Sequence, residues 1–304
     1  MKILLLAGGT GSSKLIRGFS SFSRDFSVMA NVGDNVWMQG LYICPDLDIA
    51  MYSLAGILDP AKNWGVVQDS YAAVEQLGRL GEQTWFRLGD RDLATHILRT
   101  ELLRKGRSLT QVTRTLTARL GVQQVLIPPT DEHVETRVVT SSGEYHLQEF
   151  WVRDGGKEEV TKVKYEGIEG AHPTKEALMA IEETDRIIFC PANPVTSIMP
   201  ILSIPGFREA LMKTSAVKVA LSPFVGDRPY SGPADKLMRS LGMAANSVSL
   251  SRLYEGVVDR LVIDPADEKM KGDIGRLGLR CTIAPTAMTD LAGQARVARL
   301  LVEV

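Results

Sequence analysis

A glycine-rich segment near the start of the chain has the composition of a phosphate-binding loop. The sequence GGTG, residues 8–11, follows an apolar run over residues 3–7 and precedes Lys14 and an apolar spacing typical of a helix. Glycines let backbone N–H groups approach a phosphate closely, and the N-terminus of a following helix favours negative charge. The segment matches neither the dinucleotide GxGxxG motif nor a P-loop, and a tight strand-to-helix turn would also explain its glycines. The strand-then-helix context and Lys14 favour phosphate binding.

Acidic and amide side chains follow the second predicted strand, which covers residues 26–31. Asp34 and Asn35 lie in the polar loop after this strand, and a helix predicted to begin near Asp46 carries Asp46 and Asp48 in its first turn. The helix dipole stabilises carboxylates there, and an ordinary N-cap would explain Asp46. Asp48 is then available to hold Mg²⁺ or to accept a hydrogen bond from a substrate hydroxyl.

Charged residues gather around the start of a helix predicted over residues 90–105: Arg87, Asp90, Arg91, Asp92 and His96. We expect Asp90 to cap this helix. We expect His96 to lie on the face away from Ile97 and Leu98, where the core does not require it. A solvated charged face would explain the cluster, and the alternative is an arginine clamp for an anionic or hydrogen-bonding ligand.

Two further polar loops follow predicted strands in the second half of the chain. One holds Asn193, Thr196 and Ser197, and the other runs from Ser222 to Gly232. Glycine and proline are common in plain loops, so neither loop is diagnostic by itself. In parallel sheets, however, ligands bind at the carboxyl ends of strands, and five polar loops of this sequence occupy that position.

The elements that would hold these loops alternate between strand and helix along most of the chain. Strands are predicted at residues 2–7, 26–31, 186–191, 217–223, 260–264 and 280–285, with helices at 90–105, 109–120, 174–183, 205–214, 234–241, 267–277 and 290–301. This alternation predicts an α/β fold, a Rossmann-like, mostly parallel sheet with helices on both faces. We expect a single domain over residues 1–304 with a β-rich insertion at about residues 134–170.

Two features are expected inside this insertion. The alternation around TSSGEY predicts a β-hairpin that pairs Thr136 to Thr140 with Tyr145 to Trp151. The charged, glycine-punctuated residues 157–170 are predicted to form an exposed, irregular excursion from the core.

The composition restricts the partners that the protein can have. Its 304 residues include 35 Lys plus Arg against 36 Asp plus Glu, so the net charge of -1 provides no strong field for nucleic acid or an anionic membrane. No apolar run approaches the roughly 20 residues of a membrane span, and a signal peptide is not recognisable, so we expect a cytoplasmic protein. The three cysteines have no zinc spacing, and neither a Ser-His-Asp order nor HExxH indicates a hydrolase.

Six segments of the chain together resemble the 2-phospho-L-lactate transferase family of coenzyme F-420 biosynthesis. They are AGGTGSSKL, NVGDNVW, GLYICPDLDIAMYSLAG, WFRLGDRDLATHILR, NPVTSIMPIL and GPADKLM, and the resemblance runs from residue 3 to about residue 240. It implies transfer of a phospholactyl-type group from a guanosine diphosphate-linked donor to the terminal ribityl hydroxyl of the deazaflavin Fo, with release of GMP. It also implies Mg²⁺ as a cofactor and a homodimer.

The resemblance implies roles for individual residues. The donor phosphates are expected at Gly9, Thr10, Gly11 and Lys14, and the guanine nucleotide at Asn193, Thr196, Ser197, Ser222 and Gly232. Asp48 and Arg87 match the positions associated with Fo, and the expected metal ligands are Asp48, Asp34 and Asn35. As catalytic residues we predict Asp48, which with Mg²⁺ would orient the attacking hydroxyl, and Lys14 and Arg91, which would offset charge on the transferring phosphate.

Two positions depart from the family pattern. This chain has NVGDN where relatives usually carry NTGDD or NVGDD, so Asn35 replaces an expected acid. An amide oxygen can coordinate a metal but has one negative charge less, so we expect weaker Mg²⁺ binding. Ser12 and Ser13 replace the smaller or proline-containing pair usual after GGTG, which changes how the helix start approaches a phosphate.

Two other protein classes compete with the transferase interpretation. The related gluconeogenesis-factor family of nucleotide-sugar-binding regulatory proteins shares the glycine-rich start but carries an acidic, glycine- and serine-rich stretch after the second strand. Here that stretch is NVGDNVWMQG, which together with PDLD and LGDRDLATH favours the transferase. An NAD-dependent oxidoreductase would need GxGxxG and an acid at the end of the second strand. The acyl part of the donor stays open, because phospholactate, phosphoenolpyruvate and phosphoglycerate differ by groups that one contact can distinguish.

Overall fold

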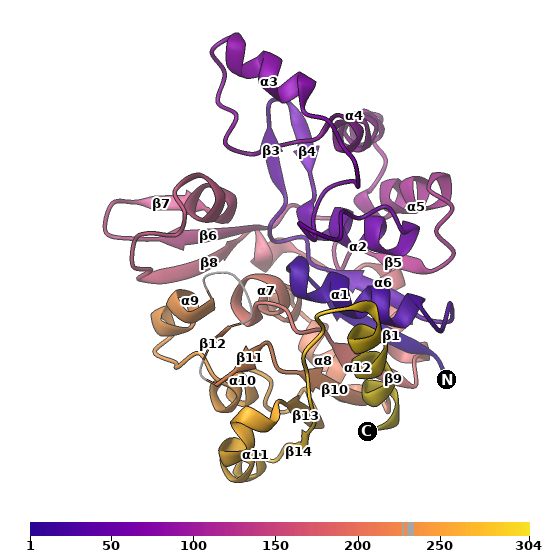
Figure 1. Cartoon of the computed structure of the whole chain (residues 1–304), viewed down its shortest axis with the longest axis vertical. Helices are drawn as coiled ribbons and strands as arrows, with labels where there is room; N and C mark the ends of the chain where they lie inside the picture. Colours follow the sequence, from indigo (N-terminus) through magenta and orange to yellow (C-terminus); the bar gives the residue numbers. More distant parts are fainter. Residues whose placement is uncertain (227, 230–233) are drawn as a thin grey trace.

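A seven-stranded parallel sheet forms the centre of the protein (Figure 1). The computed structural model describes residues 1–226, 228–229 and 234–304. The strands of the sheet are β1 (Ile3–Ala7), β2 (Ser27–Ala30), β5 (Val125–Ile127), β9 (Arg186–Phe189), β10 (Val217–Leu221), β13 (Arg260–Ile263) and β14 (Arg280–Ile283). Their order is β14-β13-β10-β9-β1-β2-β5, and every neighbouring pair is parallel. The predicted Rossmann-like sheet is confirmed.

Helices cover both faces of the sheet, because alternate residues of each apolar strand point to opposite sides. In β1, Leu4 and Leu6 join one buried cluster and Leu5 joins the other. The helices on the Leu5 side are α1 (Gly9–Ser20), α2 (Pro45–Ala55), α5 (Leu109–Arg119) and α12 (Leu291–Glu303). Those on the other side are α6 (Lys175–Glu183), α7 (Met199–Ser203), α8 (Phe207–Lys213), α9 (Ala234–Ser240), α10 (Ser247–Leu253) and α11 (Lys271–Arg276). None of the described helices has the length and apolarity needed to cross a membrane.

The strand order reverses at β1, and this reversal locates a crevice. From β1 the sheet grows outward through β2 to β5, and from the adjacent β9 it grows the other way through β10 and β13 to β14. The helix after β1 covers one face, whereas the helices after β9 cover the other. The two connections therefore diverge at the carboxyl ends of β1 and β9, which is where ligands bind in open α/β sheets.

An excursion between β2 and α5 stands above the sheet in Figure 1. It contains the antiparallel hairpin of β3 (Val36–Met38) and β4 (Leu41–Ile43), then α3 (Ala72–Arg79) and α4 (Asp90–Arg104). The prediction that Asp90 caps its own helix is wrong. Its carboxylate accepts hydrogen bonds from backbone N–H groups at the start of α3, while Asp69 accepts from those at the start of α4. Asp90, the first residue of α4, thus caps α3, and Asp69, which precedes α3, caps α4. This exchange of capping residues ties the two helices together.

The β-rich insertion is a three-stranded antiparallel sheet. Its central strand β6 (Glu135–Val139) pairs with β7 (Glu144–His146) on one edge and with β8 (Lys162–Glu166) on the other. The prediction that the second hairpin strand reaches Trp151 is wrong, because it ends at His146 and a π-helical turn follows over Glu149–Arg153. The prediction of an irregular segment over 157–170 is also wrong, since β8 lies inside it. The charged residues of β8 face solvent, while Val163 and Tyr165 pack against the core. The sequence therefore alternates as a strand does, but its many charged residues suggested an irregular segment.

A lysine from the second half of the chain anchors this insertion. Lys236 in α9 directs its ammonium group at the carbonyl oxygens of Gly156 and Lys157, at 2.6 and 2.7 Å, and at that of Glu158, at 3.3 Å. An ammonium group has three donors, one for each of these carbonyls. Because the anchored segment directly follows the π-helical turn, Lys236 holds that turn in place.

Replacing Lys236 with methionine tests this anchor. Hydrogen bonds to a charged group contribute about 1.5–3 kcal/mol in favourable cases, and all three are lost together. We expect Lys236→Met to accelerate trypsin cleavage after Lys157 by about tenfold, the effect of roughly 1.4 kcal/mol on local opening. Fragment mass spectrometry measures the rate, with Lys213→Met, on the exposed end of α8, as the matched control. Equal rates in the two variants would show that Lys236 does not hold the segment.

Candidate active site

A cavity of about 550 Å³ opens at the carboxyl ends of β1 and β9. Residues 8–11 and residues 191–197 contribute two of its walls, and the starts of α2 and α4 contribute a third. The remaining wall comes from the excursion before α4 and from the β-rich insertion. The cavity therefore occupies the crevice made by the reversal of strand order, and its volume is typical of small-molecule sites.

The loops after β1 and β9 approach each other so closely that glycine is required between them. A Cβ atom on Gly8 would lie 2.4 Å from Cβ of Ser197, and one on Gly11 would lie 2.2 Å from the carbonyl oxygen of Pro191. Helix α1 begins at Gly9, between these two contact positions, and its first residues line the cavity. A helix N-terminus at a cavity wall favours an anionic group of a ligand.

Asp46 connects the loops around the cavity. Its buried carboxylate accepts hydrogen bonds from the backbone N–H of Gly9, at 2.7 Å, and from Nδ2 of Asn31, at 2.9 Å. Asn31, the first residue after β2, also donates to the carbonyl oxygen of Thr196, at 3.0 Å. The prediction that Asp46 is an ordinary N-cap is wrong, because Cys44 occupies that position of α2. Asp46 instead ties together the ends of β1, β2 and β9.

Asp34 and Asp46 are two buried carboxyl groups of the cavity wall. Burial raises the pKa of Asp46 to about 6, although hydrogen bonds from Asn31 and Gly9 act in the opposite direction. Burial raises the pKa of Asp34 well above its usual value, and the charge of Asp46 raises it further. Oδ1 of Asp34 is buried without a hydrogen-bond partner among the described residues. Two buried carboxylates with an unpartnered oxygen are a donor set that fits a hard cation such as Mg²⁺.

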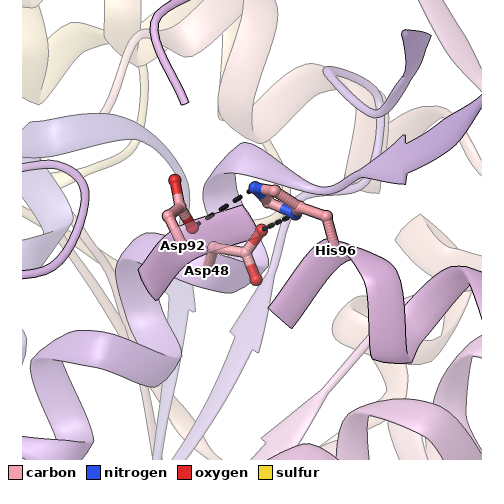
Figure 2. Close-up of side chains that lie close together, drawn as sticks. All are labelled: Asp48, Asp92 and His96. Carbon is pink, nitrogen blue, oxygen red and sulfur yellow. Dashed lines mark ion pairs between the residues drawn. The ribbon is translucent and has the colours of Figure 1, made fainter. Parts of the chain in front are cut away.

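A second acidic cluster surrounds His96 (Figure 2). Nδ1 of His96 lies 3.7 Å from Oδ2 of Asp48, and Nε2 lies 3.2 Å from Oδ1 of Asp92. One potential ligand atom from each residue lies within 4.8 Å of the others. His96 does lie on the face of α4 away from Ile97, but the expectation that the core does not require it is wrong, since His96 is 1% exposed whereas Ile97 is 53% exposed. The polar stripe of α4 faces inward because it meets the carboxylate at the start of α2.

Arg99 supplies the positive charge of this cluster. Its buried guanidinium forms a two-pronged ion pair with both oxygens of Asp48, with Nη1 at 3.0 Å from Oδ2. Burial would lower the pKa of Arg99, but the charge of Asp48 holds it above its usual value. Burial raises the pKa of Asp48, and Arg99 counteracts this effect. The charge of Asp48 is therefore balanced from inside the protein.

Aromatic side chains from two separate segments form the outer wall. They are Trp64, Trp85 and Phe86 from the excursion and Trp151 from the insertion. Arg87 lines the same wall, and its guanidinium carbon lies 4.4 Å from the ring centre of Tyr71. Aromatic faces together with a stacked guanidinium favour a planar ligand that can stack and accept hydrogen bonds.

Nine of the predicted site residues line this one cavity: Gly9, Thr10, Gly11, Asp34, Asp48, Arg87, Asn193, Thr196 and Ser197. Among them, Asn193 also has a local task, because its Oδ1 accepts hydrogen bonds from the backbone N–H groups of Val195 and Thr196. The residues assigned to donor and acceptor thus face the same space. Their individual binding roles stay predictions.

The two basic residues predicted to act in catalysis lie elsewhere. Lys14 is half-buried beyond the first turn of α1 and is not part of the described cavity lining. Arg91 is exposed and also outside that lining, and its Nη1 donates to the carbonyl oxygen of Val67, at 3.3 Å.

Three further predicted residues do not belong to the described wall. Asn35 is buried beside it, where Nδ2 donates to the hydroxyl of Tyr42, at 3.2 Å. Ser222 is buried behind it, with its hydroxyl 2.8 Å from that of Ser247. Gly232 lies outside the described residues.

The sequence reasoning missed Arg99 and the aromatic wall. A signal for Arg99 was present, because Asp92, His96 and Arg99 are spaced i, i+4, i+7 and so share one stripe of a helix. An apolar Ile97 beside this stripe favoured the opposite orientation. The aromatic residues are far apart in the sequence, and no spacing rule connects them.

The chain is similar to known proteins over nearly its whole length. A family model described as 2-phospho-L-lactate transferase CofD matches residues 3–274. A phosphoenolpyruvate transferase of Streptomyces griseus is 38% identical over 312 residues, covering 100% of this chain and 98% of the relative. A 2-phospho-L-lactate transferase of Methanosarcina acetivorans is 36% identical over 302 residues, covering 99% of this chain and 98% of the relative.

A solved structure has a similar fold. It is the crystal structure of a UPF0052 family member from Bacillus halodurans, with a TM-score of 0.66 over 99% of this chain and 98% of that one. The two sequences are 16% identical, so the likeness concerns the fold alone.

The buried pair of carboxyl groups predicts an unusual response to substitution. Asp34 binds its proton at a higher pH in the folded protein than in the unfolded chain, so the wild type loses stability as the pH rises toward that raised pKa. Asp34→Asn removes this loss. In the presence of EDTA, its Tm should exceed the wild-type Tm at pH 8, by about 2 °C for each kcal/mol, and the difference should narrow at pH 5. Thermal unfolding followed by circular dichroism measures both values.

Asp25→Asn is the matched control, because Asp25 is exposed. Its Tm should follow the wild type at both pH values. A Tm of Asp34→Asn below that of the wild type at pH 8 would contradict the assigned cost of burying Asp34.

Proposed function

The chain belongs to the 2-phospho-L-lactate transferase family, and on this premise we propose that it transfers a phospholactyl-type group from a guanosine diphosphate-linked donor to the terminal ribityl hydroxyl of Fo, releasing GMP. The observation that carries the proposal is the shared cavity. Its lining includes the N-terminus of α1 and an aromatic wall, with Asp48 and Arg87 also at its surface. The homodimer expected from the family stays a prediction.

The sheet loops are the proposed donor side. The N-terminus of α1 offers backbone N–H groups and a positive dipole end to the diphosphate. Thr196 and Ser197 offer hydroxyl groups from the facing loop, where Asn193 holds the local backbone. The missing side chain of Gly8 lets Ser197 lie against the start of α1, so the two loops present their polar groups to the same part of the cavity.

The outer wall is the proposed acceptor side. A deazaflavin ring system is flat and aromatic, and stacking on tryptophan faces together with contact to Arg87 would suit it. The ribityl chain would then extend from the ring toward the interior of the cavity, where Asp48 lies. A carboxylate at that position can accept a hydrogen bond from the attacking hydroxyl.

Mg²⁺ is proposed to bind at Asp34 and Asp46. Both carboxyl groups are buried, and their mutual repulsion is reduced by a cation. Both oxygens of Asp48 accept from Arg99, so we propose no metal-ligand role for Asp48. Nδ2 of Asn35 donates to Tyr42, but its Oδ1 is buried without a partner among the described residues, so Asn35 keeps an oxygen for the metal although it lies outside the described cavity lining. A bound Mg²⁺ would supply charge neutralisation for the donor phosphates.

The proposed reaction is an in-line displacement at phosphorus. The hydroxyl oxygen of Fo bonds to the phosphorus that carries the lactyl-type group, the hydroxyl proton is released, and the bond from this phosphorus to the oxygen of GMP breaks. Asp48 orients the hydroxyl. We assign the offset of phosphate charge to the N-terminus of α1 rather than to Lys14 and Arg91, because those two side chains lie outside the described cavity lining. Positioning and charge neutralisation carry most of such catalysis.

The donor can be identified directly. The enzyme is incubated with Fo, Mg²⁺ and one of three guanylated donors, made from phospholactate, phosphoenolpyruvate or phosphoglycerate, and products are weighed by mass spectrometry. We expect at least one donor to give a phosphodiester of Fo and an equal amount of GMP. Absence of product with all three donors would contradict the transferase proposal and favour a nucleotide-binding regulatory protein.

Arg87 provides a test of the acceptor side. Arg87→Met removes the stacked guanidinium but leaves Tyr71 and the aromatic wall. We expect the KM for Fo to rise about tenfold, the effect of roughly 1.4 kcal/mol, with an unchanged KM for the donor. Steady-state kinetics with each substrate varied in turn measures the two constants. Arg104→Met, at the far end of α4, is the control, and an equal rise of both KM values in Arg87→Met would argue against the acceptor assignment.

A further inference from the structure

The cluster of Asp48, Asp92 and His96 has the side chains of a metal site, but an arginine already lies inside it. Three potential ligand atoms gather within 4.8 Å, all from buried residues. Arg99 enters from the next turn of α4 and is itself among the largest fully buried side chains of the described residues. A buried guanidinium destabilises the folded protein unless its charge is paired and its N–H groups are hydrogen-bonded. The partners of Arg99 therefore indicate its role.

The partners of Arg99 are the same atoms that a metal would use. Its two terminal nitrogens pair with the two carboxylate oxygens of Asp48, and Nη1 also lies 3.0 Å from Nδ1 of His96. A guanidinium only donates hydrogen bonds, so Nδ1 must accept. The lone pair with which His96 could bind a metal is therefore already engaged.

The tautomer of His96 follows from this contact. With Nδ1 as acceptor, the imidazole proton lies on Nε2, which faces Oδ1 of Asp92 at 3.2 Å. The same oxygen accepts a hydrogen bond from the hydroxyl of Tyr52, at 2.7 Å. Polar contacts thus connect Asp48, through Arg99 and His96, to Asp92, although Nε2 of His96 makes no hydrogen bond among the described residues.

We propose that Arg99 is the resident cation of this cluster and acts as the positioning residue that holds Asp48 toward the acceptor hydroxyl. The inference rests on the proposed function, since it concerns the orientation of the residue that receives Fo. The two-pronged pair fixes the plane of the carboxylate, which a single contact would leave free to rotate. Asp48 is thereby oriented without a metal ligand role.

A metal-binding comparison tests the first half of the proposal without any substrate. Arg99→Met frees Asp48, Asp92 and His96, so we expect this variant to bind one more equivalent of Co²⁺ than the wild type, with visible absorption from a histidine-ligated ion. The double variant Arg99→Met/His96→Gln should lose that extra equivalent. Co²⁺ bound at Asp34 and Asp46 is expected to be the same in all three proteins, so it does not contribute to the difference in bound equivalents between them. No gain in Arg99→Met, or a histidine-ligated Co²⁺ in the wild type, would overturn the proposal.

Kinetics tests the second half. Arg99→Lys keeps a positive charge but loses the fork, so we expect kcat to fall about tenfold and the KM for Fo to rise, while the KM for the donor stays unchanged. Arg99→Met should show a larger loss than Arg99→Lys, and Arg104→Met on the same helix should behave as the wild type. Equal activity of the lysine variant and the wild type would overturn the positioning role, as would an equal loss with both substrates. If the wild type itself transfers nothing, the proposed function fails, whereas the Co²⁺ comparison still decides whether Arg99 is the cation of the cluster.

Discussion

The buried carboxylate of Asp46 is the interaction on which the arrangement of the cavity depends. It receives the backbone N–H of Gly9 and the amide of Asn31, and Asn31 in turn reaches the carbonyl of Thr196. Three strand ends that are far apart in the sequence are thereby held at fixed separation. A buried carboxylate is tolerated there because it is hydrogen-bonded, yet burial still raises its pKa to about 6. Such a residual cost at the cavity wall is typical of a group retained for binding rather than for stability.

The sequence was sufficient to predict the sheet, because each central strand is apolar and buried on both faces. It was not sufficient where charged residues gave a strand or a helix cap the composition of a different element. The strand β8 alternates as Lys-Val-Lys-Tyr-Glu, and three charged residues in five suggested an exposed loop. Asp90 has the residue type of an N-cap, but its partner is a helix that is distant along the chain by about twenty residues, and local spacing carries no information on such an exchange.

The candidate site was predictable to the extent that it follows the strands. Glycines after β1 and hydroxyl residues after β9 reach the cavity because the ends of parallel strands meet there. Side chains on helices depend on rotation about the helix axis, and this is where the errors lie. His96 faces inward and Lys14 does not line the cavity, although residue type alone favoured the reverse. Arg99 is found only when its i, i+7 relation to Asp92 is combined with the position of α2.

The cavity compensates its buried acids in two different ways, and this division has a consequence for its chemistry. The charge of Asp48 is neutralised by Arg99, which is part of the chain and cannot leave the site as a bound metal ion can. The orientation of the Asp48 carboxylate therefore does not depend on a bound metal. Among the described residues no cation forms an ion pair with Asp34 or Asp46, and burial raises the pKa of both, so we propose that a divalent cation bearing phosphates balances their charge. In the proposed function, the acceptor side is thus organised before any ligand binds, whereas the donor side would reach charge balance only with its ligand. A net charge of -1 for the whole chain is compatible with a polyanionic substrate for this reason, since recognition depends on a few local charges rather than on the overall field.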